Sequence, residues 1–296
     1  MRSTKKKIFR GKLTIKGQIV KVTASKYYVL INGETLPYGA RGAIKYNGDR
    51  LVVGDFVEVE NGVISKIYPR KSKFIRPNVA NVDCVNIVIA SVPEPDFLLV
   101  DKIIATTIYG GAKIILTVNK ADLSGELYEY VIKNYSSAVD KMFFVSAKTG
   151  EGVEELKAYL KDLLVVFIGQ SAVGKTSLCN SIFNFEMKVG ELSDKTQRGK
   201  HTTTSSQIFY SNGFGVVDTP GFNDSLCDVK AEDLSSCYLE FEPYLNSCYF
   251  LDCKHVFEPN CAIKNAVEKG EISLERYNRY VEIYKNLLKD EKNAKY

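Results

Sequence analysis

One glycine-rich stretch in the second half of the chain constrains its fold more than any other feature. Residues 169–176 read GQSAVGKT and match the phosphate-loop pattern GxxxxGK followed by Ser or Thr. The apolar run LLVVFI stands before this pattern, and SLCNSIF, which suits a helix, stands after it. A phosphate loop requires this strand–loop–helix context, so a chance match in a surface loop is the weaker alternative. The stretch therefore predicts an α/β domain that binds the phosphates of a nucleotide.

Each part of this loop has a chemical task in that interpretation. Gly169 and Gly174 let backbone N–H groups turn onto the phosphates, and the N-terminus of the following helix adds positive potential. Lys175 is expected to reach the β- and γ-phosphates, and Thr176 to bind Mg²⁺. The predicted nucleotide contacts of the loop are Gly169, Gln170, Ser171, Ala172, Val173, Gly174, Lys175, Thr176 and Ser177. The loop alone does not distinguish an ATPase, a kinase and a GTPase.

A second motif follows the predicted strand at 113–119 and indicates which base the nucleotide carries. The letters NKAD place Asn119, Lys120 and Asp122 at the carboxyl end of that strand, where ligands bind in such sheets. A carboxylate at Asp122 can accept hydrogen bonds from N1–H and the N2 amino group of guanine, whereas adenine offers neither donor. We expect Lys120 to cover the ring and Asn119 to tie this loop to the phosphate side.

Two more motifs complete a set for a guanine nucleotide. SAK, made of Ser146, Ala147 and Lys148, ends the next strand, and the Ala147 backbone N–H in that place commonly contacts guanine. DTPG ends the strand FGVV. In GTPases its aspartate, here Asp218, serves the water shell of Mg²⁺, and its glycine, here Gly221, offers an N–H to the γ-phosphate.

The order of these motifs along the chain is unusual. NKAD and SAK precede the phosphate loop, whereas most GTPases begin with that loop. We therefore predict a circularly permuted GTPase domain, in which the same sheet is cut and rejoined elsewhere. In this order the segment after DTPG, which moves when the γ-phosphate leaves, runs directly into the C-terminal part of the chain. The nucleotide state is therefore expected to bias how that part sits.

The residues between the phosphate loop and DTPG contain the expected switch. Residues 197–204, QRGKHTTT, offer a Thr to Mg²⁺ and the γ-phosphate, and we assign Thr203, although the pattern does not distinguish it from the Thr on either side. Phe222 stands where many GTPases have the Gln that orients the attacking water. His201 is the local candidate for this catalytic role, since an imidazole can accept a water proton near neutral pH. A His that faces solvent or contacts RNA is the equal alternative.

A cysteine cluster near the C-terminus predicts a metal site. Cys248, Cys253, His255 and Cys261 supply three thiolates and one imidazole within fourteen residues. This is a closed tetrahedral set for one structural Zn²⁺, and chance clustering of buried cysteines is the alternative. The chain has seven cysteines, an odd number without a secretory signal, which argues against a disulfide framework.

The remaining pattern divides the chain into three domains. Residues 1–70 hold a basic arm and four or five short strands, which favour an OB-fold barrel, with an SH3-like barrel as the alternative. The arm has seven Lys and Arg and no acid in residues 1–16, which suits a phosphate backbone or a solvated terminus. Residues 71–225 alternate apolar strands with helices, and residues 226–296 hold the metal cluster and helices. We interpret 69–81 as a linker. No apolar run is long enough to span a membrane, so a soluble intracellular protein is expected.

Together these motifs resemble the RsgA (YjeQ/YloQ) family of circularly permuted, ribosome-associated GTPases. The similarity covers nearly the whole chain: VVGDFVEV, NVANVD, NKAD, SAKTGEGVEEL, the phosphate loop, RGKHTTT, DTPGF and the cysteine cluster. One departure is Ala172, where the family usually has glycine. The resemblance implies a cytoplasmic GTPase that acts late in maturation of the small (30S) ribosomal subunit and is stimulated by it. It also implies that the OB-fold and the zinc domain bind 16S rRNA, and that His201 matches the switch histidine of the family. We expect a monomer, since nothing in the sequence requires a dimer.

The sequence leaves three other functions open. The first is an RNA-binding module in which GTP acts only as a conformational clamp. The second is a metabolic P-loop kinase, against which NKAD and the barrel argue. The third is a permuted GTPase that acts on the large ribosomal subunit.

Overall fold

The computed structural model describes most of the chain, in two compact units that we take one at a time. The described residues are 14–42, 44, 50–75, 77–123, 125–183, 206–211, 213–218 and 229–293. The units are Met1–Arg70 and Lys71–Tyr296. Within the described ranges, no helix is both long and apolar enough to cross a membrane.

The first unit is a small five-stranded barrel. Its strands are β1 (Thr14–Val22), β2 (Tyr27–Ile31), β3 (Glu34–Ala40), β4 (Phe56–Glu60) and β5 (Val63–Ile67), in the order β1-β2-β3-β5-β4. The barrel closes because β1 pairs antiparallel with both β2 and β4, while β3 runs parallel to β5. Buried Ile19, Val29, Val57 and Ile64 fill its interior. This arrangement confirms the predicted OB-fold barrel.

The second unit contains a mainly parallel sheet with helices on both faces. Its strands are β8 (Cys84–Ala90), β9 (Lys113–Asn119), β10 (Lys141–Phe144), β11 (Leu164–Ile168), β12 (Gln207–Ser211) and β13 (Phe214–Asp218), and they lie in the order β10-β9-β8-β11-β13-β12. Only β12 among these six is antiparallel to its neighbour. All seven residues of β8 are buried, because helices cover both faces of a central parallel strand.

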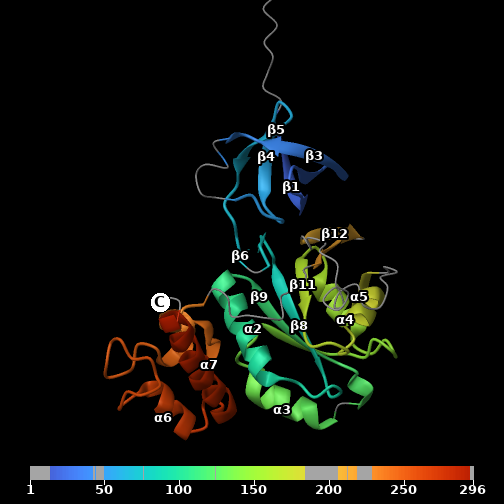
Figure 1. Ribbon diagram of the computed structural model, residues 1–296. Coiled ribbons are helices and arrows are strands. Elements are labelled where there is room, and N and C mark those ends of the chain that lie inside the picture. Colours follow the sequence, from blue (N-terminus) through green and yellow to red (C-terminus); the bar gives the residue numbers. More distant parts are fainter. Residues whose placement is uncertain are drawn as a thin grey trace, which may run out of the picture. The chain divides into compact units, whose positions relative to one another are not determined.

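Four helices cover this sheet. They are α2 (Phe97–Gly110), α3 (Gly125–Tyr135), α4 (Val153–Leu160) and α5 (Lys175–Phe183). Figure 1 shows α2 and α3 on one side of the sheet and α4 and α5 on the other. Leu156 of α4 and Leu178 of α5 pack into one core with Val88 of β8. The alternation of strands and helices confirms the predicted α/β domain.

The segment that we interpreted as a linker contains structure of its own. Residues Lys73–Phe74 and Val79–Ala80 form β6 and β7, a two-stranded antiparallel ladder. Phe74 is buried against the end of α2, where a Cβ on Gly110 would lie 2.5 Å from the Phe74 ring. Strands β6 and β7 therefore belong to the second unit instead of to an open connection.

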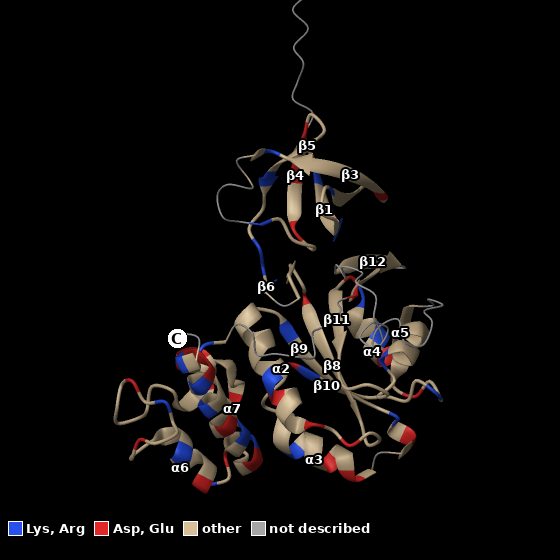
Figure 2. Cartoon of the chain, in the orientation of Figure 1, with Lys and Arg blue, Asp and Glu red and all other residues tan. Residues whose placement is uncertain are grey.

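The C-terminal part packs directly on α2. Two 3₁₀ helices, η2 (Ala231–Cys237) and η3 (Leu239–Tyr244), precede α6 (Ala262–Glu268) and α7 (Leu274–Asn293). Tyr238, Phe241 and Tyr280 form one buried core with Ala105 of α2. Basic and acidic residues are mixed along α7, so neither sign of charge dominates this helix (Figure 2).

Candidate functional site

The phosphate-loop motif connects the carboxyl end of β11 to the first turn of α5. Gly174 has φ +93°, and a Cβ on it would lie 2.4 Å from Nδ2 of Asn119, so a larger residue would displace that side chain. Lys175 is buried and crosses the loop, with its Nζ donating to the carbonyls of Gly169 at 2.8 Å and Gln170 at 2.6 Å. Thr176 is buried beside it. The left-handed Gly174 and the buried Lys175 are features that the phosphate-loop pattern predicts.

Ala172 occupies a backbone conformation that disfavours its side chain. Its φ is +64°, in the left-handed region that only glycine adopts without steric cost. The departure from the family pattern noted above therefore has a physical meaning, because glycine would fit this turn better.

Asn119 joins the NKAD motif to the phosphate loop and to SAK. Its Nδ2 donates to the Val173 carbonyl at 2.9 Å, and its Oδ1 accepts the Ala147 N–H at 3.1 Å. Asn119 is buried, so these bonds are shielded from water. One side chain thus links the phosphate loop to SAK.

Lys120 and Asp122 are also oriented by named partners. The Lys120 Nζ donates to the carbonyls of Ala172 at 2.9 Å and Val92 at 2.6 Å. The Ser146 hydroxyl donates to Oδ1 of Asp122 at 2.9 Å, which fixes the carboxylate at the edge of the sheet. NKAD, SAK and the phosphate loop therefore converge, although more than fifty residues separate the first from the last.

The other predicted nucleotide residues lie along the same edge or outside the described ranges. Ser171, Ser177 and Lys148 are exposed. Asp218 ends β13, which runs parallel to β11, so Asp218 lies at the edge of the sheet that carries the phosphate loop. His201, Thr203, Gly221 and Phe222 lie outside the described residues.

Sequence reasoning missed the segment between β8 and α2. Gln170 was predicted as a nucleotide contact, but its side-chain amide contacts this segment: Oε1 accepts the Asp96 N–H at 3.0 Å and Nε2 donates to the Glu94 carbonyl at 3.2 Å. Lys120 reaches the same segment at Val92. No sequence signal could have shown this, because the partners on the segment are all backbone atoms.

The predicted metal ligands form a compact group. The ligand atoms of Cys248, Cys253, His255 and Cys261 all lie within 4.8 Å of one another. Nδ1 of His255 is 3.4 Å from the Sγ atoms of both Cys248 and Cys261, and those two Sγ atoms are 3.9 Å apart. Tetrahedral Zn²⁺ with ordinary bond lengths would separate S from N by about 3.6 Å and S from S by about 3.8 Å. The group is consistent with a zinc site.

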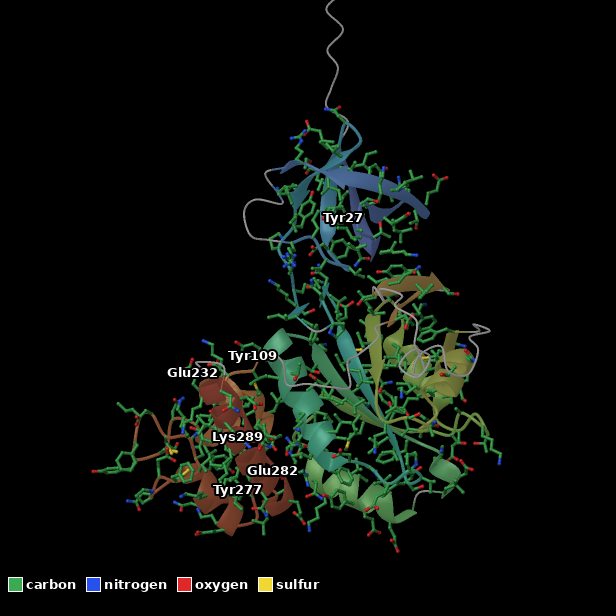
Figure 3. The ribbon with its side chains drawn as sticks, viewed as in Figure 1. Tyr27, Tyr109, Glu232, Tyr277, Glu282 and Lys289 are labelled. Atoms are coloured by element: carbon green, nitrogen blue, oxygen red, sulfur yellow. The ribbon has the colours of Figure 1, made fainter. Side chains whose placement is uncertain are left out.

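The surroundings of this group hold its ligands in place. The Tyr277 hydroxyl, labelled in Figure 3, donates to the His255 carbonyl at 2.9 Å. The Glu258 carboxylate accepts the N–H groups of Lys254, Val256 and Phe257, which orders the loop around His255. Burial lowers the pKa of His255, so the ring is in the neutral form that can bind a metal. Burial raises the pKa of Cys253 to about 12, so a cation is needed to make its sulfur a thiolate.

Comparisons with known proteins agree with this geometry. Residues 67–227 match the family model described as RsgA GTPase. The small ribosomal subunit biogenesis GTPase RsgA of Caldanaerobacter subterraneus subsp. tengcongensis is 40% identical, over 94% of this chain and 97% of its own length. The protein of the same description from Thermotoga neapolitana is 39% identical, over 86% of this chain and 90% of its own.

Solved structures show the same architecture. The crystal structure of YjeQ from Thermotoga maritima superposes with a TM-score of 0.78 and 33% identity, covering 93% of this chain and 99% of that one. YloQ, described as a circularly permuted GTPase, superposes with a TM-score of 0.75 and 27% identity, covering 96% and 98%. Because the family model matches more than half of the chain and the relatives align along nearly all of it, the resemblance is confirmed and the chain belongs to the RsgA GTPase family.

Proposed function

We propose that this chain hydrolyses GTP to GDP and phosphate during late maturation of the small (30S) ribosomal subunit. The observation that carries the nucleotide part is Asn119, whose amide joins the phosphate loop to SAK. That link assembles a guanine site from motifs in permuted order. The ribosomal part is supported by the relatives, which are described as small ribosomal subunit biogenesis GTPases.

In this proposal the guanine is read at the end of β9 and the phosphates are bound between β11 and α5. Asp122 accepts from the base and Lys120 covers the ring. The Ala147 N–H, which donates to Oδ1 of Asn119, shares its hydrogen with the guanine oxygen when the nucleotide binds. Lys175 leaves the loop carbonyls for the β- and γ-phosphates. The full nucleotide set is Asn119, Lys120, Asp122, Ser146, Ala147, Lys148, Gly169, Gln170, Ser171, Ala172, Val173, Gly174, Lys175, Thr176, Ser177, Asp218 and Gly221.

Two kinds of metal belong to the proposal. Mg²⁺ arrives with GTP and is bound by Thr176 and by Thr203 of the switch. One structural Zn²⁺ is bound by the Cys₃His group, and metal binding of this kind contributes on the order of 10–16 kcal/mol of folding free energy in small peptides. The loop from Leu245 to Asn260 is described without helices or strands, so it would depend on that contribution.

The catalytic and RNA-binding assignments follow the family. His201 activates or orients the attacking water, since Phe222 lacks the atoms to do so. The barrel of residues 1–70 and the zinc domain of residues 226–296 bind 16S rRNA, and the GTPase domain spans residues 71–225. The protein acts in the cytoplasm as a monomer.

The experiment that tests the proposal is GTP hydrolysis measured with purified 30S or 50S subunits. We expect 30S subunits to accelerate turnover and 50S subunits to leave it unchanged. Stimulation by 50S alone would assign the chain to the large subunit. If RNA binding depends on GTP but 30S subunits leave the turnover unchanged, the chain would be an RNA-binding module in which GTP acts only as a conformational clamp. A preference for ATP in nucleotide binding would contradict the guanine site altogether.

A further inference from the structure

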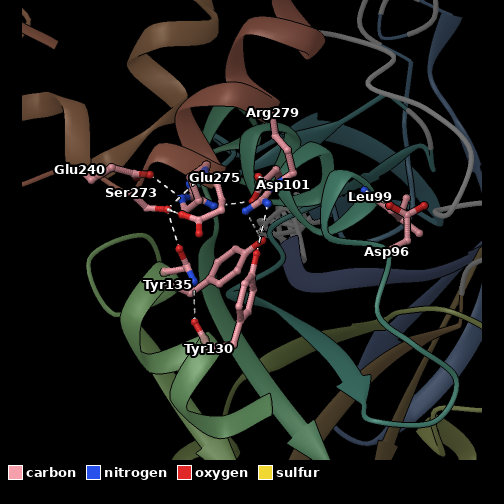
Figure 4. Close-up of polar contacts among 11 residues, drawn as sticks. Asp96, Leu99, Asp101, Tyr130, Tyr135, Glu240, Ser273, Glu275 and Arg279 are labelled. Atoms are coloured by element: carbon pink, nitrogen blue, oxygen red, sulfur yellow. Dashed lines mark hydrogen bonds and ion pairs between the residues drawn. The ribbon is translucent and has the colours of Figure 1, made fainter. Parts of the chain in front are cut away.

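Helix α7 is held on α2 by a largely buried group of four charged side chains, one of which comes from η3. Arg276 donates to the carboxylates of Asp101 and Glu240, and Nε of Arg279 donates to the other oxygen of Asp101 (Figure 4). The Arg276 guanidinium lies between the rings of Tyr135 and Tyr238, at 4.8 and 5.0 Å from their centroids. The two positive and two negative charges cancel. Burial lowers the pKa of Arg276, but Asp101 and Glu240 raise it by more, so the guanidinium stays charged.

Helix α2 also contacts the phosphate loop, at its N-terminus. Asp96 caps α2, with Oδ1 accepting the Leu99 N–H at 2.9 Å (Figure 4). The backbone N–H of Asp96 donates to the Gln170 amide, and the same amide donates to the Glu94 carbonyl. Gln170 therefore contacts two backbone positions, Glu94 and Asp96, just before the first turn of α2.

The two attachments are close together on one rigid element. Asp96 and Asp101 are five residues apart, which is about 7.5 Å along an α-helix. A hydrogen-bonded helix transmits a tilt over that distance with little bending, so a change in how α7 holds Asp101 reaches Gln170. The phosphate loop and the C-terminal helix are thus connected through the first two turns of α2.

We propose that Gln170 is a positioning residue that holds the phosphate loop on α2, so that α7 influences the affinity of the loop for guanine nucleotide. The inference rests on the proposed function, because it takes the loop to be the nucleotide site. A loop already held by Gln170 loses less conformational freedom when it closes on phosphates. Loosening α2 from α7 removes part of that advantage, and by linkage a bound nucleotide steadies α7 in return.

A double-mutant cycle measures this coupling in the full-length protein. Gln170→Met keeps the length of the side chain and removes both hydrogen bonds, while Arg279→Gln releases one oxygen of Asp101. Kd for a fluorescent GDP analogue is measured for the wild type, both single variants and the double variant. Lys285→Gln removes a charge from an exposed position of α7, the helix that carries Arg279, and serves as the control.

We expect the effect of each substitution on Kd to depend on whether the other substitution is present. Gln170→Met weakens GDP binding about fivefold, as for the loss of about one net hydrogen bond. In the Arg279→Gln background the same change weakens it less than twofold, because contacting networks are not additive. Equal effects in both backgrounds, or an unchanged Kd in Arg279→Gln, would overturn the proposal.

The first comparison of a second measurement uses the wild type alone, so it does not depend on how well a variant folds. Amide hydrogen exchange of α7 is compared in the wild type with and without saturating GDP. Exchange in Tyr280–Leu287 should slow at least threefold, and the slowing should be lost in Gln170→Met; unchanged wild-type exchange would refute the coupling. If the wild type binds no GDP, the proposed function fails instead, so the two failures are distinguishable.

Discussion

The most direct test of the phosphate-loop geometry is the substitution Ala172→Gly. Ala172 is exposed and has φ +64°, so its methyl group makes the left-handed turn costly without packing against a core. An L-residue in this region costs roughly 1–2 kcal/mol. Glycine removes this cost, but it also raises the conformational entropy of the unfolded chain, which lowers the free energy of unfolding by about 0.4–1 kcal/mol. The net expectation is that the free energy of unfolding rises by about 0.5–1 kcal/mol.

The chain offers a control with the same chemistry and the opposite expected sign. Ala158 is exposed in the middle of α4, where φ is helical and alanine is the best residue. Ala158→Gly should therefore lower the free energy of unfolding by about 0.5–1 kcal/mol. Both substitutions remove one exposed methyl group from the same unit, so the change in methyl solvation contributes equally to the free energy of unfolding of the two variants.

Thermal unfolding of the nucleotide-free protein, followed by circular dichroism, separates the two variants. For a unit of this size, 1 kcal/mol shifts Tm by about 2–4 °C, so the two melting temperatures should differ by roughly 2–8 °C. Ala172→Gly should melt above the wild type and Ala158→Gly below it. If both variants melt below the wild type by the same amount, the left-handed turn does not strain Ala172, and the reasoning is wrong.

Three other changes test the guanine contact of Asp122, the charged group around Arg276 and the Cys₃His group. Asp122→Asn should shift the preference from guanine to xanthine nucleotides, because the amide offers a donor. Competition assays with GDP and XDP measure this preference, and an unchanged affinity for GDP would mean that another residue contacts the base. Arg276→Met should lower the free energy of unfolding by about 3–5 kcal/mol in urea titrations, since it leaves Glu240 buried without its partner, and a loss below 1 kcal/mol would contradict the buried cluster. Removal of zinc by a chelator should make residues 245–261 sensitive to protease, and unchanged resistance there would refute a structural metal.

Much of the fold could be predicted because its elements leave strong local signals. The strand at Lys113–Asn119 contains the apolar residues IIL and a valine, and the helix Phe97–Gly110 lies between a capping Asp96 and the left-handed Gly111. The motifs that converge on Asn119 could be predicted because each recurs at a strand end with fixed spacing. Strands β6 and β7 were missed, since two residues each are too few for any periodicity.

The interactions that sequence could not predict join distant backbone or charged groups. The amide of Gln170 contacts backbone atoms of Glu94 and Asp96, and any residue there would offer the same atoms. Arg276 lies in a helix rich in Lys and Glu, a composition typical of a solvated surface, yet its side chain is buried. Burial of a charge depends on partners that approach from Asp101 and Glu240, far away in the sequence.

The contacts between α7 and α2 limit how the nucleotide state can affect the C-terminal part of the chain. Asp218 ends β13 in the sheet, and Val229 is buried in the core that α7 shares with α2. Ten residues, 219–228, join these two anchored ends. Moving α7 off α2 would expose the apolar core that Ala105 and Tyr280 share, so we do not expect release of a γ-phosphate to detach α7 from α2. The nucleotide signal is therefore expected to act on the C-terminal part through the ten-residue connection and through small changes of α2, and not through a swing of the whole domain.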